Sequence, residues 1–151
     1  MQISNYINYL HRCEEELGQA FKTASKLYEA EPDVREMCKV FASWSLDLSE
    51  NLTIMLSRYG LGKEYESNPI NHSFKIGRTG SLGLLRDLHE LWLMTNEVKL
   101  VWIILKQSAK ALRDEKLKLA CAQFGRQTIQ QSEWLMMKIK HSAPQALTVP
   151  A

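Results

Sequence analysis

The sequence predicts an all-α protein, a four-helix bundle, on three observations. Core positions recur at three- and four-residue spacing through four long segments, which is the period of one buried helix face. Two of the breaks between these segments are short and one is about 20 residues long. The chain has 151 residues, 45 % of them hydrophobic and 24 % charged, which suits one domain with its own core. We therefore expect two antiparallel hairpins joined by a long crossover, in a single domain over residues 1–151.

The first helix is predicted over residues 3–30. Proline cannot continue a helix interior, so Glu31-Pro32-Asp33 ends this helix. Asp33 and Glu36 have the spacing of a capping box, which places the start of the second helix near Val34. The buried line of the first helix is Ile3, Tyr6, Leu10, Cys13, Leu17, Ala20, Ala24 and Leu27.

The second helix is predicted over residues 34–59, with Gly60 as a left-handed C-cap. Residues 60–80 contain four glycines, two asparagines and Pro69, which marks them as a crossover rather than a helix. About 20 extended residues span roughly 65 Å, more than the length of a 30-residue helix. The crossover can therefore make the second and third helices parallel. The buried line of the second helix is Val34, Cys38, Phe41, Ser45, Leu48, Leu52, Met55 and Tyr59.

The third helix is predicted over residues 81–112, with Ser81 as its N-cap. The fourth is predicted over residues 114–141, after Arg113-Asp114. Because the tail from Ser142 contains Pro144 and Pro150, we expect it to be irregular. The buried line of the third helix is Leu84, Leu88, Leu91, Thr95, Val98, Trp102, Leu105, Ala109 and Leu112; that of the fourth is Leu117, Cys121, Phe124, Thr128, Gln131, Leu135 and Lys138 or Ile139.

None of these lines contains a carboxylate or a histidine. Four neutral polar residues, Ser45, Thr95, Thr128 and Gln131, fall at about the same level of the bundle. They form either a hydrogen-bonded network that sets the helix register or a small polar cavity for a water molecule or ligand. The carboxylates best placed to bind a metal are Glu14, Glu90 and Glu97, although pairing of Glu97 with a lysine or arginine on a neighbouring helix is the simpler interpretation.

The remaining composition indicates a cytoplasmic protein. Cys13, Cys38 and Cys121 are odd in number, form no C-x-x-C pair and fall on buried lines, so we expect free, buried thiols. The N-terminus lacks a signal-peptide pattern, and no stretch is apolar enough to span a membrane. The net charge is only +2, and basic residues are not clustered with exposed aromatics, so nucleic acid is not an expected partner.

Two hairpins joined by one long crossover is also the layout of ferritin-like bundles, and the chain resembles the ferritin-like superfamily over nearly its whole length. Four strings are similar to those of small bacterial ferritin-like proteins: Glu31-Pro32-Asp33-Val34, Trp44-Ser45, Arg58-Tyr59-Gly60 and Ala143-Pro144-Gln145-Ala146-Leu147. In rubrerythrins and bacterioferritins, members of this superfamily, two helices each carry a glutamate and two carry Glu-x-x-His, which together bind two metal ions. The resemblance therefore implies a di-iron site in the middle of the bundle.

The sequence departs from that pattern at the site itself. It contains no Glu-x-x-His, and the middle of the fourth helix offers Gln127, Thr128, Gln130 and Gln131, which bind iron poorly. None of the histidines falls in mid-bundle: they are His11, His72, His89 and His141. We therefore expect a degenerate site and no cofactor.

Apolar residues of the third helix cover more than its buried line, because Leu93, Leu100 and Ile104 point away from that line. Extra apolar surface on one helix is typical of a partner interface, so we expect a homodimer through this helix. The alternative is that the crossover covers this stripe with Tyr65, Ile70, Phe74 and Ile76.

The function that these observations favour is a non-catalytic ferritin-like bundle that serves as a scaffold or protein-interaction module. The first alternative is an iron-handling or redox protein with an atypical site of Glu14, Glu90, Glu97 and Gln131, completed by a histidine from a partner chain. The second is a small-ligand site in the polar middle of the bundle, lined by Ser45, Thr95 and Gln131.

Overall fold

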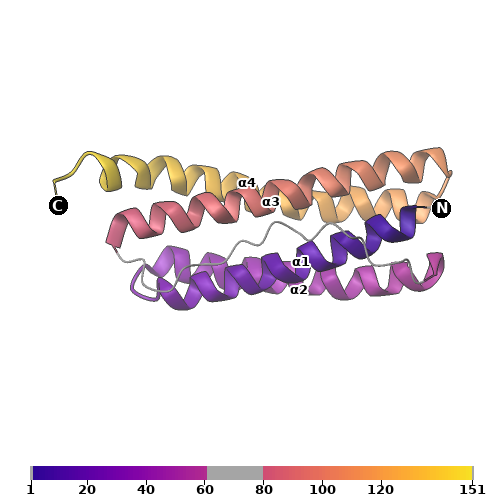
Figure 1. Ribbon diagram of the computed structural model, residues 1–151, viewed down its shortest axis with the longest axis horizontal. Coiled ribbons are helices and arrows are strands. Elements are labelled where there is room, and N and C mark those ends of the chain that lie inside the picture. Colours follow the sequence, from indigo (N-terminus) through magenta and orange to yellow (C-terminus); the bar gives the residue numbers. More distant parts are fainter. Residues whose placement is uncertain (1, 61–79, 151) are drawn as a thin grey trace.

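The computed structural model describes residues 2–60 and 80–150, which form a four-helix bundle (Figure 1). Helix α1 (Ile3–Leu27) and helix α2 (Pro32–Tyr59) form one antiparallel hairpin, and helix α3 (Gly80–Ala111) and helix α4 (Glu115–Leu147) form the other. The hairpins meet mainly through α1 and α3. Helices α2 and α3 run in the same direction, so the predicted all-α architecture and order of connections are confirmed.

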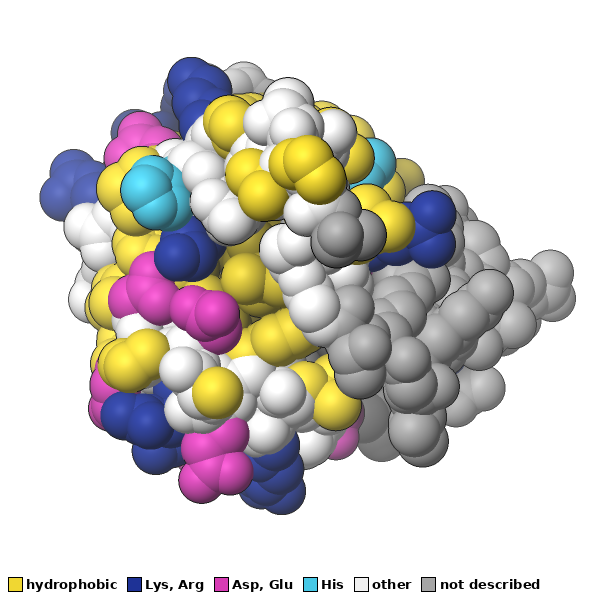
Figure 2. All heavy atoms as spheres, turned by 90° about the vertical axis from the view of Figure 1, so that its left-hand side faces the viewer, with side chains coloured by type: hydrophobic (Ala, Val, Ile, Leu, Met, Phe, Trp, Pro, Cys, Tyr) yellow, Lys and Arg dark blue, Asp and Glu magenta, His cyan; other side chains and the backbone are white. Residues whose placement is uncertain are grey.

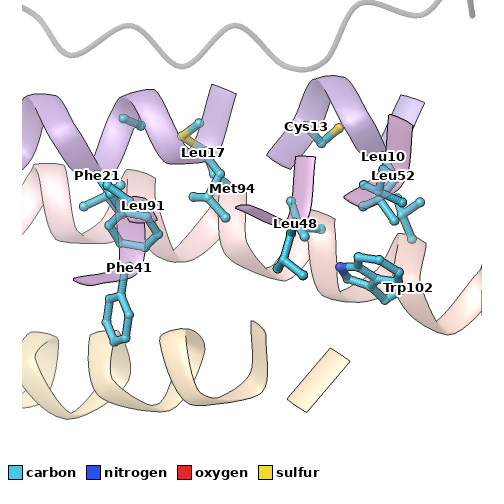
Figure 3. Packing of buried hydrophobic residues seen from close by; sticks show 14 of the residues in the cluster. Leu10, Cys13, Leu17, Phe21, Phe41, Leu48, Leu52, Leu91, Met94 and Trp102 are labelled. Carbon is cyan, nitrogen blue, oxygen red and sulfur yellow. The ribbon is translucent and has the colours of Figure 1, made fainter. Parts of the chain in front are cut away.

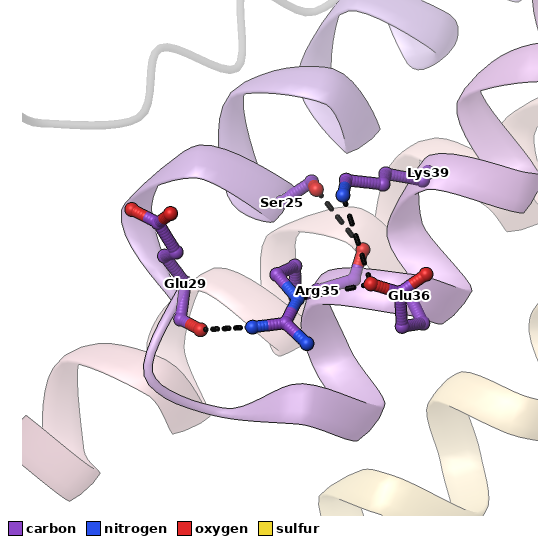
Figure 4. Close-up of polar contacts among 5 residues, drawn as sticks. All are labelled: Ser25, Glu29, Arg35, Glu36 and Lys39. Carbon is purple, nitrogen blue, oxygen red and sulfur yellow. Dashed lines mark hydrogen bonds and ion pairs between the residues drawn. The ribbon is translucent and has the colours of Figure 1, made fainter.

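The turn between α1 and α2 is held by side chains at its two sides (Figure 4). The Ser25 hydroxyl donates to the carbonyl oxygen of Arg35 at 3.0 Å, and Arg35 Nη1 donates to the carbonyl oxygen of Glu29 at 3.0 Å. Arg35 Nε and Lys39 Nζ both lie near Glu36 Oε1, at 3.0 and 3.6 Å. Glu36 therefore pairs with its own helix.

The predicted capping box at Asp33 is wrong. Helix α1 ends at Leu27 rather than near residue 30, and α2 begins two residues earlier than expected, with Glu31 as N-cap and Pro32 in its first turn. Proline is favoured there because the first N–H groups of a helix have no intrahelical partner. Asp33 lies within the first turn, and its Oδ2 is 2.6 Å from Lys138 Nζ of α4.

The start of α4 follows the prediction. Asp114 is its N-cap, and its Oδ1 accepts from the backbone N–H of Leu117 at 3.1 Å. The same carboxylate accepts from the Tyr59 hydroxyl and from Arg58 Nη2, at the end of α2. The hydrogen bond from Tyr59, that from Leu117 N–H and the Arg58 charge hold the pKa of Asp114 below its ordinary value. This one residue thus joins the two hairpins.

The expected irregular tail is wrong in its first part, because α4 continues to Leu147. Pro144 lies in the last turns, where its missing N–H leaves only the Lys140 carbonyl without a helical donor, and Lys140 lies on the exposed side. Thr148 closes the helix, since its N–H and its hydroxyl both donate to the Pro144 carbonyl, at 2.9 and 2.6 Å. Leu147 is 67 % exposed and does not pack on the bundle.

Two glycines, one in α1 and one at the end of α2, occupy positions that a larger residue would fit poorly. A Cβ atom at Gly18 would lie 2.8 Å from Leu46 Cγ, so the absence of a side chain allows these two helices to approach closely. Gly60 has φ +83° and ψ 166°. Its positive φ agrees with a glycine stop, but its ψ is extended, so the predicted left-handed cap is not formed.

The core follows most of the predicted lines (Figure 3). Phe21 of α1 and Phe41 of α2 have ring centroids 5.4 Å apart, and Trp134 of α4 lies 5.8 Å from Phe41. The three cysteines are free and buried, as predicted. Two ends of the lines are wrong: Leu27 and Leu112 are exposed, and Tyr28 takes the place of Leu27 in the core.

Contrary to the sequence analysis, the core contains carboxylates. Glu14 is completely buried and Asp87 is 1 % exposed. The prediction followed one line per helix, but α1 packs against both α2 and α3, so two neighbouring positions, Cys13 and Glu14, are buried together. The hydroxyl of Tyr28 donates to Asp87 and joins α1 to α3.

No helix within residues 2–60 and 80–150 is long and apolar enough to cross a membrane.

Candidate functional site

Glu14 is the centre of a polar cluster inside the bundle. The indole N–H of Trp102 on α3 donates to Glu14 Oε1 at 3.0 Å, and the Ser45 hydroxyl of α2 also bonds this carboxyl. Ser45 Oγ in turn accepts from Gln131 Nε2 of α4 at 3.0 Å. We call Glu14, Ser45, Trp102 and Gln131 the mid-bundle cluster; each helix contributes one of its members.

The direction of these bonds follows from the second bond of Gln131. Its Nε2 also donates to the Phe41 carbonyl oxygen at 3.2 Å, so the amide nitrogen must face α2. Ser45 Oγ therefore accepts from Gln131 and has its own proton free to donate to Glu14. The bonds run from α4 through α2 to the carboxyl on α1.

Two acceptors of the cluster lack a donor. Glu14 Oε2 and Gln131 Oε1 are buried and have no hydrogen-bond partner among the described residues. Burial raises the pKa of Glu14 to about 7, against the opposite effect of the hydrogen bonds from Trp102 and Ser45. Near pH 7 the neutral and charged forms of this carboxyl group are therefore both populated.

The predicted polar layer is only partly joined by hydrogen bonds. Ser45 and Gln131 bond each other, as described above, whereas Thr95 Oγ1 donates to the Leu91 carbonyl and Thr128 Oγ1 to the Phe124 carbonyl of their own helices. All four side chains are completely buried. The two threonines satisfy their hydroxyl groups locally, which is the common behaviour of threonine within a helix.

The other two carboxylate candidates lie on α3, outside the cluster. The Tyr9 hydroxyl of α1 donates to Glu97, so the partner of Glu97 is a phenol rather than the expected lysine or arginine. Burial and this contact raise the pKa of Tyr9. Glu90 is half-buried on α3. Among the described residues, no group of three or more His, Cys, Asp or Glu side chains is arranged to bind a metal ion.

The outward side of α3 and α4 exposes a second feature. Leu93 and Leu100, predicted as interface residues, are 43 % and 56 % exposed, whereas Ile104 is half-buried and Ile103 is exposed in its place. Helix α4, which packs against α3, has exposed apolar residues of its own. We call this set the outer α3–α4 face: Leu93, Leu100, Ile103, Ile129, Met136 and Met137. The covering residues proposed as an alternative, Tyr65, Ile70, Phe74 and Ile76, lie outside the described residues, as does His72.

A groove of about 530 Å³ lies on this face between the two helices. Trp92 and Met136 supply apolar lining, and Asn96 Nδ2 donates to Ser132 Oγ across the groove at 3.4 Å. Its charged lining residues are Lys99, Glu133 and Lys140. A groove with an apolar lining and charges of both signs is suited to another helical surface.

Two functional partners escaped the sequence analysis. Trp102 lies on the predicted buried line of the third helix, but its indole N–H also binds Glu14, 88 residues away. Tyr9 lies off the predicted buried line, yet this half-buried phenol, one helical turn before Cys13, contacts α3 through Glu97. The usable signal was that a buried indole or phenol normally requires a hydrogen-bond partner.

Comparison with protein-family models, with curated proteins and with solved structures gives no match to this chain.

Proposed function

We propose that this chain is a non-catalytic interaction module, a bundle of the ferritin-like type without an intact di-iron centre, and that it binds a second copy of itself through the outer α3–α4 face. The observation that carries this proposal is the exposure of six large apolar side chains on α3 and α4, two of which, Met136 and Met137, line the groove between these helices. Burying such surface against a partner is favourable by about 25 cal/mol per Å² of apolar area.

A second copy is the occupant that the charges favour. In a two-fold dimer the same face meets itself, so residue i contacts residue j of the partner and the reverse. The groove is lined by Lys99 and Lys140 together with Glu133. A face that carries both signs can pair with itself, lysine against glutamate, without like charges meeting.

The ferritin-like assignment is supported by the connectivity of the chain, with two hairpins and parallel α2 and α3. The non-catalytic role is supported by the contacts of the candidate carboxylates. Glu14 Oε1 accepts from an indole and Glu97 Oε1 from a phenol, so one oxygen of each carboxylate already has a protein partner.

We expect the chain, of 17.4 kDa, to form a dimer at about 10 μM by light scattering coupled to size-exclusion chromatography. Leu100→Asp places a charge in the proposed interface and should yield a monomer, because a buried unpaired charge costs several kcal/mol. The control is Ile54→Asp, which changes an apolar residue on α2 that is at least as exposed as Leu100 and should remain dimeric. A monomeric unmodified chain at this concentration would refute the proposed dimer.

A separate measurement tests the alternative iron-handling function. Protein purified without chelator, soaked aerobically with ferrous iron and desalted should retain no iron by inductively coupled plasma mass spectrometry. Retention of about two irons per chain, lost in Glu14→Gln but kept in Glu15→Gln, would overturn the scaffold proposal and assign a metal site to the mid-bundle cluster. Glu15 is the matched control because it is exposed beside Glu14.

A further inference from the structure

A pocket of about 660 Å³ opens at the end of the bundle where α1 ends and α2 and α3 begin. Figure 2 looks onto this end and shows basic, acidic and histidine side chains around a hollow with hydrophobic side chains in it. The volume is in the range of small-molecule sites, about 300–1,000 Å³. Its apolar lining includes Leu27, Tyr28 and Leu84, and α4 supplies Lys138, His141 and Ser142.

Lys138 brings a nearly buried ammonium group to this pocket. Its side chain is 11 % exposed, and its Nζ pairs with Asp33 Oδ2 at 2.6 Å. Burial raises the pKa of Asp33, but the hydrogen bond and charge of Lys138 outweigh this effect and keep the pKa below its ordinary value. An ammonium group has three N–H donors, and Asp33 is the only partner of Lys138 among the described residues. Two donors are therefore left for another acceptor.

Ser142 supplies a second, independent donor. It follows Lys138 by four residues, so both lie on the same face of α4, and both line the pocket. Ser142 is 8 % exposed. Because this hydroxyl can rotate and donate toward the pocket, a bound ligand can accept its proton.

The hydrogen-bond donors that line this pocket favour a negatively charged ligand. The ammonium group, the hydroxyl group and the imidazole of His141 can all donate, and the N-terminus of α3 at Gly80 adds the positive end of its helix dipole. The one acidic lining residue, Glu31, is exposed. We propose that the bundle-end pocket binds a small organic oxyanion, a carboxylate or phosphate monoester, whose head meets Lys138 and Ser142 and whose apolar body lies against Leu27 and Leu84.

The test uses three probes with one apolar body: 1-naphthoate, 1-naphthyl phosphate and the neutral 1-naphthamide. Each is titrated into the full chain and followed through backbone amide resonances. We expect at least one anion to bind about tenfold tighter than the amide, with the largest shifts at residues 138–142 and 27–31. The tighter anion identifies the head group. Equal affinity of all three probes, or shifts centred elsewhere, would overturn the proposal.

Variants separate ligand binding from a structural role of the ion pair. Lys138→Met should weaken anion binding about tenfold, and Lys116→Met, an exposed lysine at the other end of α4, should not. Asp33→Asn removes the carboxylate that competes for the ammonium group, so it should strengthen binding. If Lys138→Met does not fold, anion titrations of Asp33→Asn and Ser142→Ala test the site instead. If anion affinity does not rise in Asp33→Asn and does not fall in Ser142→Ala, the proposed site is refuted.

Discussion

Replacing Glu14 by glutamine should remove a large part of the pH dependence of stability. The pKa of this carboxyl is about 7 in the folded chain and 4.5 in its ordinary state. Below pH 4.5 both states hold the proton. As the pH rises toward 7 the unfolded chain releases it first, so the free energy of unfolding falls by about 1.4 kcal/mol per pH unit. The full loss, about 3 kcal/mol, is reached above pH 7.

Urea unfolding of the unmodified chain and of Glu14→Gln, at one protein concentration between pH 4.5 and 8.5, measures this effect. The difference between the two proteins should change by about 3 kcal/mol in favour of glutamine as the pH rises, because contributions of all other groups cancel. Glu15→Gln, at the exposed neighbouring position, should show no such trend. A Glu14→Gln difference that is constant with pH would contradict a buried, titrating Glu14.

Trp102→Ala should be the most destabilising single change in the core. Trp102 is 2 % exposed and is the largest of the fully buried side chains, and its ring centroid lies 5.7 Å from that of Phe124. Loss of a buried aromatic side chain costs about 3–5 kcal/mol through transfer and cavity terms. Loss of the indole N–H also leaves Glu14 Oε1 with one donor fewer, at about 1–3 kcal/mol.

Two further variants separate the contribution of the aromatic ring to stability from that of the indole N–H group. Trp102→Phe keeps an aromatic ring but removes the N–H group, so we expect about 2 kcal/mol in urea unfolding followed by circular dichroism, and a further rise of the Glu14 pKa. Trp92→Ala removes a half-buried tryptophan at the outer groove and should cost less than Trp102→Ala. If Trp102→Ala costs no more than Trp92→Ala, the assigned role of Trp102 in the core is wrong.

The parts of the fold that sequence reasoning predicted are those set by neighbours along the chain. The four buried lines depend on a period of three to four residues, and Val34, Leu88 and Leu135 are all buried as predicted. The start of α4 was predicted to within one residue, after Arg113-Asp114, because the signals that begin a helix are confined to one turn. The errors at Asp33 and at residues 142–147 have the same local origin, since proline is compatible with the first turn and with an exposed last turn of a helix.

The contacts of the candidate sites could not be predicted in this way. Glu14 is one residue from the predicted line, and it is buried because α1 has two neighbours. Its partner Trp102 lies on another helix, and Lys138 meets Asp33 only where the ends of α2 and α4 come together. No periodicity within one helix specifies the rotation of that helix against the next.

By itself, the sequence therefore determined four helices, their order, their approximate ends and the apolar side of each. The tertiary structure alone decided that a carboxyl group with a pKa of about 7 lies inside the bundle, and that donors from α4 line a pocket at its end. The physical reason is that burial and hydrogen-bond partners depend on the packing of neighbouring helices, whereas the helical pattern depends on spacing within one segment.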